Sequence, residues 1–213
     1  VFNTQLSGTH QFNAERSEIH WALSYSRTNR SEPDWRRART QRNIDTNDPF
    51  RVVIPPSANT FDAARFFSRL FENIYTNTFD YKHVFGTDVQ KPKFTLRAGY
   101  YAEYKAREFA ARWMAYRQSS ANGFDQSLLQ LPLDQIFDNA NIGFPTGFIL
   151  NEGTNFTDSY DASNLLLAGY GGGAWNISKK VNVNFGLRTE FNRQQLNTRI
   201  SQAIPVNVDN PIL

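Results

Sequence analysis

The feature that most constrains the fold is a strict alternation of side chains that begins at Val181. Apolar residues occupy one parity (Val181, Val183, Phe185, Leu187 and Phe191), and Asn182, Asn184, Gly186, Arg188, Glu190 and Asn192 occupy the other. A period of two is the signature of a β-strand, whose successive side chains point to opposite faces. The apolar face of such a strand packs on a core in a soluble sheet, and it meets lipid in a membrane barrel with a wet lumen. The stretch therefore predicts a two-faced strand and leaves both environments open.

Other stretches of the chain repeat this alternation. Residues 4–12 and 18–26 alternate on either side of a short polar segment, which predicts a β-hairpin. Residues 94–104 alternate as cleanly, and residues 72–85 and 159–176 add two further candidate strands. We therefore expect an all-β chain of about six long strands.

Two stretches carry conflicting signals. Residues 64–72 fit an amphipathic helix, and residues 105–115 are rich in good helix formers, with Glu103/Arg107 and Glu108/Arg112 spaced for helical ion pairs. No capping residue or glycine separates residues 105–115 from the strand before them, so we predict that the strand continues there. Over the first stretch we expect a strand from about Glu72. A helical protein built on residues 62–75 and 103–117 is the alternative, and strong helical circular dichroism would reveal it.

The predicted connections alternate in length, and no membrane helix is encoded. Short polar turns are expected at residues 13–17, 86–92 and 177–180, and long loops at residues 27–63, 118–157 and 197–213. Outer-membrane barrels have this asymmetry, with short periplasmic turns and long extracellular loops, and the 31 aromatic residues could supply their interfacial girdles. The pattern predicts a partial transmembrane antiparallel β-barrel with long extracellular loops. Residues 1–213 would belong to that one barrel domain, and we interpret the sequence as a piece of a longer chain.

The residue inventory argues against an enzyme, a cofactor site and a metal site. The chain has no cysteine, its three histidines are scattered, and no nucleophile motif occurs. Residues 169–174 match a dinucleotide fingerprint, but a strand pattern follows them where a nucleotide site needs a helix. Residues 45–48 and 158–161 are acidic, but they lack the glycine and closing glutamate of a calcium loop, so turn formation is the favoured role. A formal charge of +3 indicates no nucleic-acid partner, and the basic run at residues 35–42 is interpreted as a solvated loop.

Four stretches, taken in order, resemble the middle barrel region of TonB-dependent outer-membrane receptors, of the branch with an N-terminal carboxypeptidase-regulatory-like domain. They are Glu18-Ile-His-Trp-Ala-Leu-Ser-Tyr-Ser26 followed by Glu32-Pro-Asp34, Arg65-Phe-Phe-Ser-Arg-Leu-Phe-Glu-Asn-Ile-Tyr75, Phe94-Thr-Leu-Arg-Ala-Gly-Tyr-Tyr-Ala-Glu-Tyr-Lys-Ala-Arg-Glu-Phe109, and Asn184-Phe-Gly-Leu-Arg-Thr-Glu190. The resemblance implies a 22-stranded barrel in the bacterial outer membrane, closed around a plug. This chain would supply about six strands. The TonB complex would meet segments outside these residues, and a surface lipoprotein is a possible partner.

Four charged residues stand out on the polar parity of the predicted strands: Arg97, Glu103, Arg188 and Glu190. They could line a lumen and contact plug or substrate, or they could form a structural network between wall and plug, and the structural role is favoured. No residue is predicted to be catalytic or to bind metal.

The resemblance implies active uptake of a scarce or bulky substrate, such as a metal chelate, an oligosaccharide or a peptide. Two alternatives stay open: a passive porin or structural barrel with the same wall, and a soluble secreted β-sandwich that binds carbohydrate. The long loops are expected to face the substrate.

Overall fold

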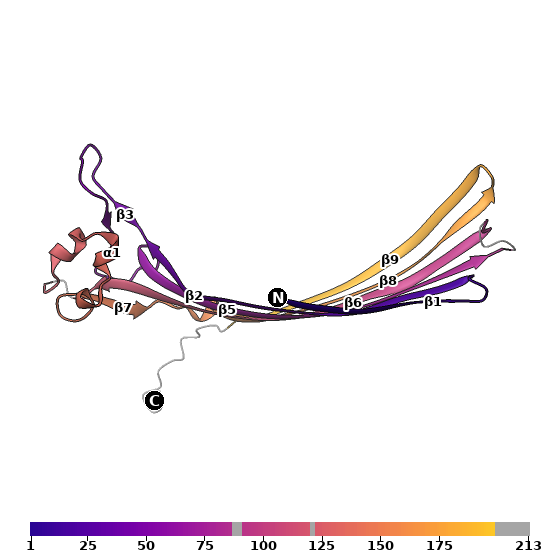
Figure 1. Ribbon diagram of the computed structural model, residues 1–213, viewed down its shortest axis with the longest axis horizontal. Coiled ribbons are helices and arrows are strands. Elements are labelled where there is room, and N and C mark those ends of the chain that lie inside the picture. The colour runs from indigo at the N-terminus through magenta and orange to yellow at the C-terminus, as the bar shows by residue number, and fades with distance from the viewer. Residues whose placement is uncertain (87–90, 120–121, 199–213) are drawn as a thin grey trace, which may run out of the picture. The chain divides into compact units, whose positions relative to one another are not determined.

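The computed structural model is all-β, and it describes residues 1–86, 91–119 and 122–198 (Figure 1). Its strands are β1 (Phe2–Phe12), β2 (Ser17–Ala38), β3 (Thr40–Gln41), β4 (Arg51–Val52), β5 (Ala63–Phe85), β6 (Phe94–Gln118), β7 (Phe148–Glu152), β8 (Tyr160–Ser178) and β9 (Val181–Thr198). The described helices are short: η1 (Gln126–Gln130), α1 (Leu133–Ile136), η2 (Asn139–Asn141) and η3 (Phe156–Asp158). Over the described residues, no helix has both the length and the apolar character needed to cross a membrane.

The long strands form one antiparallel sheet in the order β1-β2-β5-β6-β8-β9, with β7 paired to β6, and β3 and β4 form a small hairpin of their own. Between β1 and β2 the register runs from Phe2 opposite Arg27 to Phe12 opposite Ser17. β1 and β9 end this order, so each presents one edge of backbone N–H and C=O groups without a partner strand in the order. The predicted antiparallel all-β architecture is confirmed.

The chain divides into two compact units. Over the described residues, the sheet unit comprises residues 1–29, 70–108 and 161–197, and the loop unit comprises residues 30–69, 109–160 and Thr198. The connections around residues 13–16, 86–93 and 179–180 belong to the sheet unit. The two long connections, residues 39–62 and 119–159, belong to the loop unit. The predicted division between short and long connections thus coincides with the division into units.

The strands are longer than the sequence pattern indicated. β2 runs to Ala38 and β5 starts at Ala63, so the predicted loop 27–63 shrinks to residues 39–62 and holds the β3–β4 hairpin. The expectation of a strand only from Glu72 was therefore wrong by nine residues. The predicted loop 118–157 contains β7, η1, α1 and η2, and η3 runs one residue past its end. β9 continues to Thr198, and the rest of the predicted loop 197–213 lies outside the described residues.

Cross-strand contacts explain why the two stretches with helical propensity are strands. Arg107 donates from Nε to Oε2 of Glu72 on β5 at 2.7 Å, and it is not placed for a helical pair with Glu103. Arg112 pairs with Glu152 on β7 instead of Glu108. Contacts between residues far apart in sequence thus override a local helical preference of about 0.2–0.5 kcal/mol per ion pair.

The sheet unit has one apolar face. Aromatic contacts link this face across the strands: Phe2 to Tyr25, Tyr25 to Tyr75, Phe79 to Tyr100, Phe85 to Phe94, and Phe94 to Phe185. Strand alternation adds Leu6, Trp21, Leu23, Leu167, Trp175, Ile177, Val181, Val183 and Leu187 to the same face. Many of these side chains are exposed, including Leu6 at 63% and Leu187 at 79%.

The opposite face of the sheet unit is mainly polar. Arg107 pairs there with Glu72, the hydroxyl of Tyr101 donates to Glu103 at 2.8 Å, and Nε of Arg188 lies 2.6 Å from Oε1 of Glu190. The sheet unit therefore carries the predicted alternation across its whole width.

The loop unit has a hydrophobic core of its own. Val52, Ile54, Ala63, Phe124, Ile136 and Phe148 form a buried cluster, and Tyr116 of β6 and Phe137 pack against it. Phe137, which directly follows α1, and Phe148 of β7 lie with their ring centroids 6.3 Å apart. The long connections are therefore packed structures and not open coil.

Ile136 and Ile44 offer a matched test of this core, because Ile136 is fully buried and Ile44 is 88% exposed. We expect Ile136→Ala to destabilise the loop unit by about 2–5 kcal/mol, and Ile44→Ala to change its stability by less than about 0.5 kcal/mol. Amide hydrogen exchange of residues 122–152 measures both effects. Equal exchange rates in the two variants would contradict the assignment of this core.

Candidate functional site

The four predicted lumen residues lie on the polar face of the sheet unit, but the structure brings them together only in part. Arg188 and Glu190 form an ion pair within β9, whereas Glu103 contacts Lys105, at 3.7 Å, and Tyr101 within β6. β8 separates these two strands in the sheet. Arg97 is exposed, and no ion pair involves it among the described residues. The four residues thus share a face without forming one site, and their contact with a plug or substrate stays a prediction.

The glycines that match a dinucleotide fingerprint lie inside β8. A Cβ built on Gly173 would stand 2.6 Å from the ring of Phe94 and 3.0 Å from that of Phe185. Because no side chain intervenes, the rings of Phe94 on β6 and Phe185 on β9 can meet over β8. Gly173 therefore serves close packing on the apolar face.

The acidic clusters act in local turns. Asp158 accepts from the backbone N–H of Asn155 at 2.8 Å and completes the capping box of η3. Asp45 has a positive φ of 69°. No group of three or more His, Asp or Glu side chains is arranged for metal binding in the described part of the chain.

The basic run that the sequence analysis interpreted as a solvated loop lies mostly in β2, and carboxylates pair with several of its arginines. Asp34 takes hydrogen bonds from Arg36 at 2.8 Å and from Arg65 of β5 at 2.7 Å. Arg39 pairs with the buried carboxylate of Asp62 at 2.7 Å. The loop assignment was therefore wrong for the residues up to Ala38, which belong to β2, whereas most side chains of the run are exposed, as the solvated interpretation requires.

These contacts hold the pKa of the Asp34 carboxyl at about 2, below its ordinary value of 3.8. The hydrogen bond from Arg65 is the main cause, partial burial opposes it, and the hydrogen bond from Arg36 adds to the lowering. A carboxyl with a lowered pKa in the folded state stabilises the fold above its unfolded pKa. This contribution is therefore complete above about pH 4 and is lost as the pH falls toward 2.

Aromatic side chains gather around one arginine on the other side of these strands in the loop unit. We name this set the aromatic–arginine surface: Trp35, Arg37, Phe61, Phe66 and Trp113. The guanidinium carbon of Arg37 lies 5.1, 5.6 and 5.7 Å from the ring centroids of Trp35, Phe61 and Trp113. Phe66 and Trp113 pack closely, with centroids 4.3 Å apart. Trp35 stands edge-on to Phe66 at 89° and to Trp113 at 80°.

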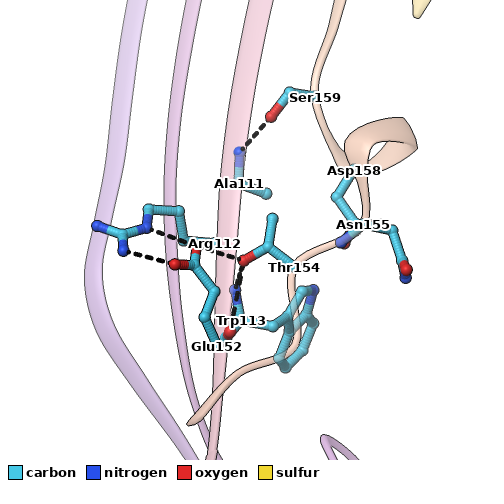
Figure 2. A network of polar contacts seen from close by, with 8 residues as sticks. All are labelled: Ala111, Arg112, Trp113, Glu152, Thr154, Asn155, Asp158 and Ser159. Atoms are coloured by element: carbon cyan, nitrogen blue, oxygen red, sulfur yellow. Dashed lines mark hydrogen bonds and ion pairs between the residues drawn. The ribbon is translucent and has the colours of Figure 1, made fainter. Parts of the chain in front are cut away.

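Figure 2 shows how the loop unit holds the strand that carries Trp113. The backbone N–H of Trp113 donates to Oγ1 of Thr154 at 2.9 Å, and the N–H of Ala111 donates to Oγ of Ser159 at 3.1 Å. The N–H of Gly153 donates to the carbonyl oxygen of Trp113 at 2.8 Å. Between the end of β7 and the start of β8, hydroxyl side chains thus replace the missing ladder bonds. Trp113 is therefore fixed from both of its backbone groups.

A bidentate ion pair secures the same segment. Nε and Nη2 of Arg112 donate to the two carboxylate oxygens of Glu152, both at 3.0 Å (Figure 2). These bonds, with one from Thr154, lower the pKa of Glu152. Parallel bonds of this fork geometry fix direction as well as distance. They hold β7 against β6 beside Trp113.

The sequence analysis did not find the aromatic–arginine surface. Trp35, Arg37 and Phe61 fell within the predicted loop 27–63, and Trp113 fell within a stretch of ambiguous structure. The only indication of this surface in the sequence was that aromatic residues lie close to arginines, as Trp35 does to Arg37. Which rings and which arginine meet depends on the pairing of β2, β5 and β6.

Comparison with known proteins gives this geometry no family. The chain matches none of the protein-family models and none of the curated proteins with which it was compared. The similarity to TonB-dependent receptors therefore stays a prediction from the residues, and the function has to be argued from the two units themselves.

The unequal roles of Arg65 and Arg36 at Asp34 can be tested. We expect Arg65→Met to raise the pKa of Asp34 toward 3.8, because it removes the main hydrogen bond, and Arg36→Met to raise it less. A carbon-13 NMR titration of the Asp34 carboxyl measures both values. An Asp34 pKa that does not change in the Arg65→Met variant would show that this pair does not form in solution.

Proposed function

We propose that this chain forms part of the wall of a transmembrane β-barrel in the bacterial outer membrane, in a transporter of the TonB-dependent kind. Its substrate would be scarce or bulky, such as a metal chelate, an oligosaccharide or a peptide. The observation that carries the proposal is the exposed apolar face of the sheet unit. Phe185, for example, is 57% exposed, and Leu23 is 48% exposed.

The size of this face argues against contact with water. Burying one large apolar side chain stabilises a fold by about 1.5–3 kcal/mol, and the face exposes more than a dozen in part. Contiguous apolar surfaces of this kind mark contacts with proteins or membranes. A lipid environment removes the free-energy cost of exposing these apolar side chains to water.

Polar groups on the apolar face are paired in the way that a membrane demands. The side-chain oxygen of Asn73 accepts from the hydroxyl of Tyr25 at 2.8 Å, and that of Asn77 accepts from the hydroxyl of Tyr100. An amide group without a hydrogen-bond partner costs on the order of several kcal/mol in hydrocarbon and almost nothing in water. Each tyrosine here belongs to a strand adjacent to β5 and satisfies one amide oxygen.

The edges of the sheet fit the same proposal. Backbone groups in hydrocarbon must be hydrogen-bonded, so the free edges of β1 and β9 would pair with further strands of a closed barrel. The membrane-crossing segments would be those of the sheet unit. The polar face, with Arg97, Glu103, Arg188 and Glu190, would line the passage or contact a plug.

The loop unit would then supply the extracellular surface, since both long connections of the described chain, residues 39–62 and 119–159, belong to it. Substrate would be captured there and moved by a plug coupled to TonB, through segments outside these residues. A surface lipoprotein is the possible second partner.

Two rival functions make different predictions. A passive porin with the same wall would have no plug domain, so the sequence of the full protein separates it from a transporter. A soluble β-sandwich would cover the apolar face with a second sheet. The exposure of Leu6, Leu167 and Leu187 argues against that cover.

Neighbouring residues of β9 provide a matched test of lipid contact. Leu187 lies on the apolar face and Asn184 on the polar face. In the full-length protein folded into lipid vesicles, we expect Leu187→Arg to destabilise the fold by up to about 2–4 kcal/mol, depending on its depth. Asn184→Arg should change stability by less than about 0.5 kcal/mol.

Urea unfolding of both variants in vesicles of a single lipid measures the difference. The proposal fails if the two arginines cost the same, or if the wild-type protein stays monomeric in water without detergent.

A further inference from the structure

We propose that the aromatic–arginine surface is a binding site for an acidic oligosaccharide, with one sugar carboxylate on Arg37 and a sugar ring against Trp35 and Phe61. The inference goes beyond a role in a membrane wall. It rests only on residues of the loop unit and does not require that the chain contacts lipid.

The charge of Arg37 is not neutralised by a carboxylate. Among the described residues, Arg36 and Arg39 of the same run have carboxylate partners, whereas Arg37 lies over aromatic rings and forms no ion pair. A guanidinium over aromatic rings is held by its cation–π contacts, and it keeps N–H donors that suit a carboxylate. Arg37 is therefore a held cation that lacks an anion.

Ring surface is available beside this cation. Phe61 is 73% exposed and Trp35 is 48% exposed. The ring of Trp35 lies at 89° to Phe66 and at 80° to Trp113, so neither ring stacks face to face on it. Flat, exposed aromatic faces match the C–H-rich face of a sugar ring, and Trp and Arg are the side chains that dominate binding surfaces.

The rings of this surface are held in place. Phe66 and Trp113 pack against each other within it. The backbone N–H of Trp113 donates to Thr154 (Figure 2), and its carbonyl oxygen accepts from Gly153. Rings that are already ordered lose little conformational freedom on binding. The surface is thus preorganised for a ligand.

The arrangement selects an isolated acid group over a polyanion. Nucleic acid needs a row of available cations, and here carboxylates engage the neighbouring arginines. Acidic peptide motifs are commonly bound by clusters of arginines, whereas Arg36 and Arg39 beside Arg37 are already engaged by carboxylates. Side-chain rings and one guanidinium instead fit a sugar that carries one carboxylate.

Isothermal titration of the purified protein in detergent micelles with tri-galacturonate tests the proposal. We expect binding that weakens at least about tenfold for the methyl-esterified trisaccharide, because the ester removes the charge that Arg37 would bind. The neutral sugar maltotriose should bind as weakly as the ester. These comparisons use the wild-type protein, so they do not depend on the folding of any variant.

Variants then locate the site. Arg37→Gln should weaken binding of tri-galacturonate at least about tenfold, and Trp35→Ala should weaken it as well. Arg42→Ala is the matched control, because Arg42 also lies over a ring, that of Phe50 at 4.8 Å, and its loss should leave binding unchanged. Thermal unfolding of each variant checks that the loop unit is intact.

Several outcomes would overturn the inference. They are the absence of tri-galacturonate binding, equal binding of the methyl ester, equal weakening by Arg42→Ala, or equally tight binding of inorganic phosphate or of a peptide that ends in tryptophan. Binding by a protein that stays monomeric without detergent would support this inference and contradict the membrane proposal, so the two fail separately.

Discussion

The hydrogen-bonded pairing of long antiparallel strands is the constraint on which the rest of this structure depends. Once the backbones pair, every second side chain is committed to the same face, and a slip of one residue would exchange the two faces. In the sheet unit this rule gathers rings from β1, β2, β5, β6 and β9 on one side. It places the ion pair of Arg107 and Glu72 on the other. The separation of the apolar face from the polar face of the sheet unit therefore follows from the register of strand pairing.

Glycine and asparagine refine this apolar face. Gly173 removes a side chain so that two rings can meet across a strand, and Asn73 and Asn77 are each tied to a tyrosine hydroxyl. These are residues that a simple hydrophobicity pattern counts against a membrane strand. In three dimensions they fit the apolar face, because the glycine increases ring contact and each asparagine oxygen has a donor.

Much of the architecture could be predicted from the sequence, because alternation is a local signal. The hairpin of β1 and β2, the strand that begins at Phe94 and the strand that begins at Val181 were all visible in the residues. The start of β5 and the length of β6 were harder to predict, since their residues favour a helix locally and only pairing with distant strands decides otherwise. The ion pair of Asp34 with Arg65 spans 31 residues and has no local signal at all.

The same limit applies to the candidate site, and the run of arginines from Arg36 to Arg42 shows why. In the sequence these arginines are alike, and their number suggested only a solvated basic loop. The structure separates them by their partners: a carboxylate for Arg36 and Arg39, one ring for Arg42, and three rings for Arg37. Whether a cationic side chain can bind a ligand is decided by the groups that already neutralise it. A count of charges along the chain therefore could not single out Arg37, whereas the pairing of β2, β5 and β6 does.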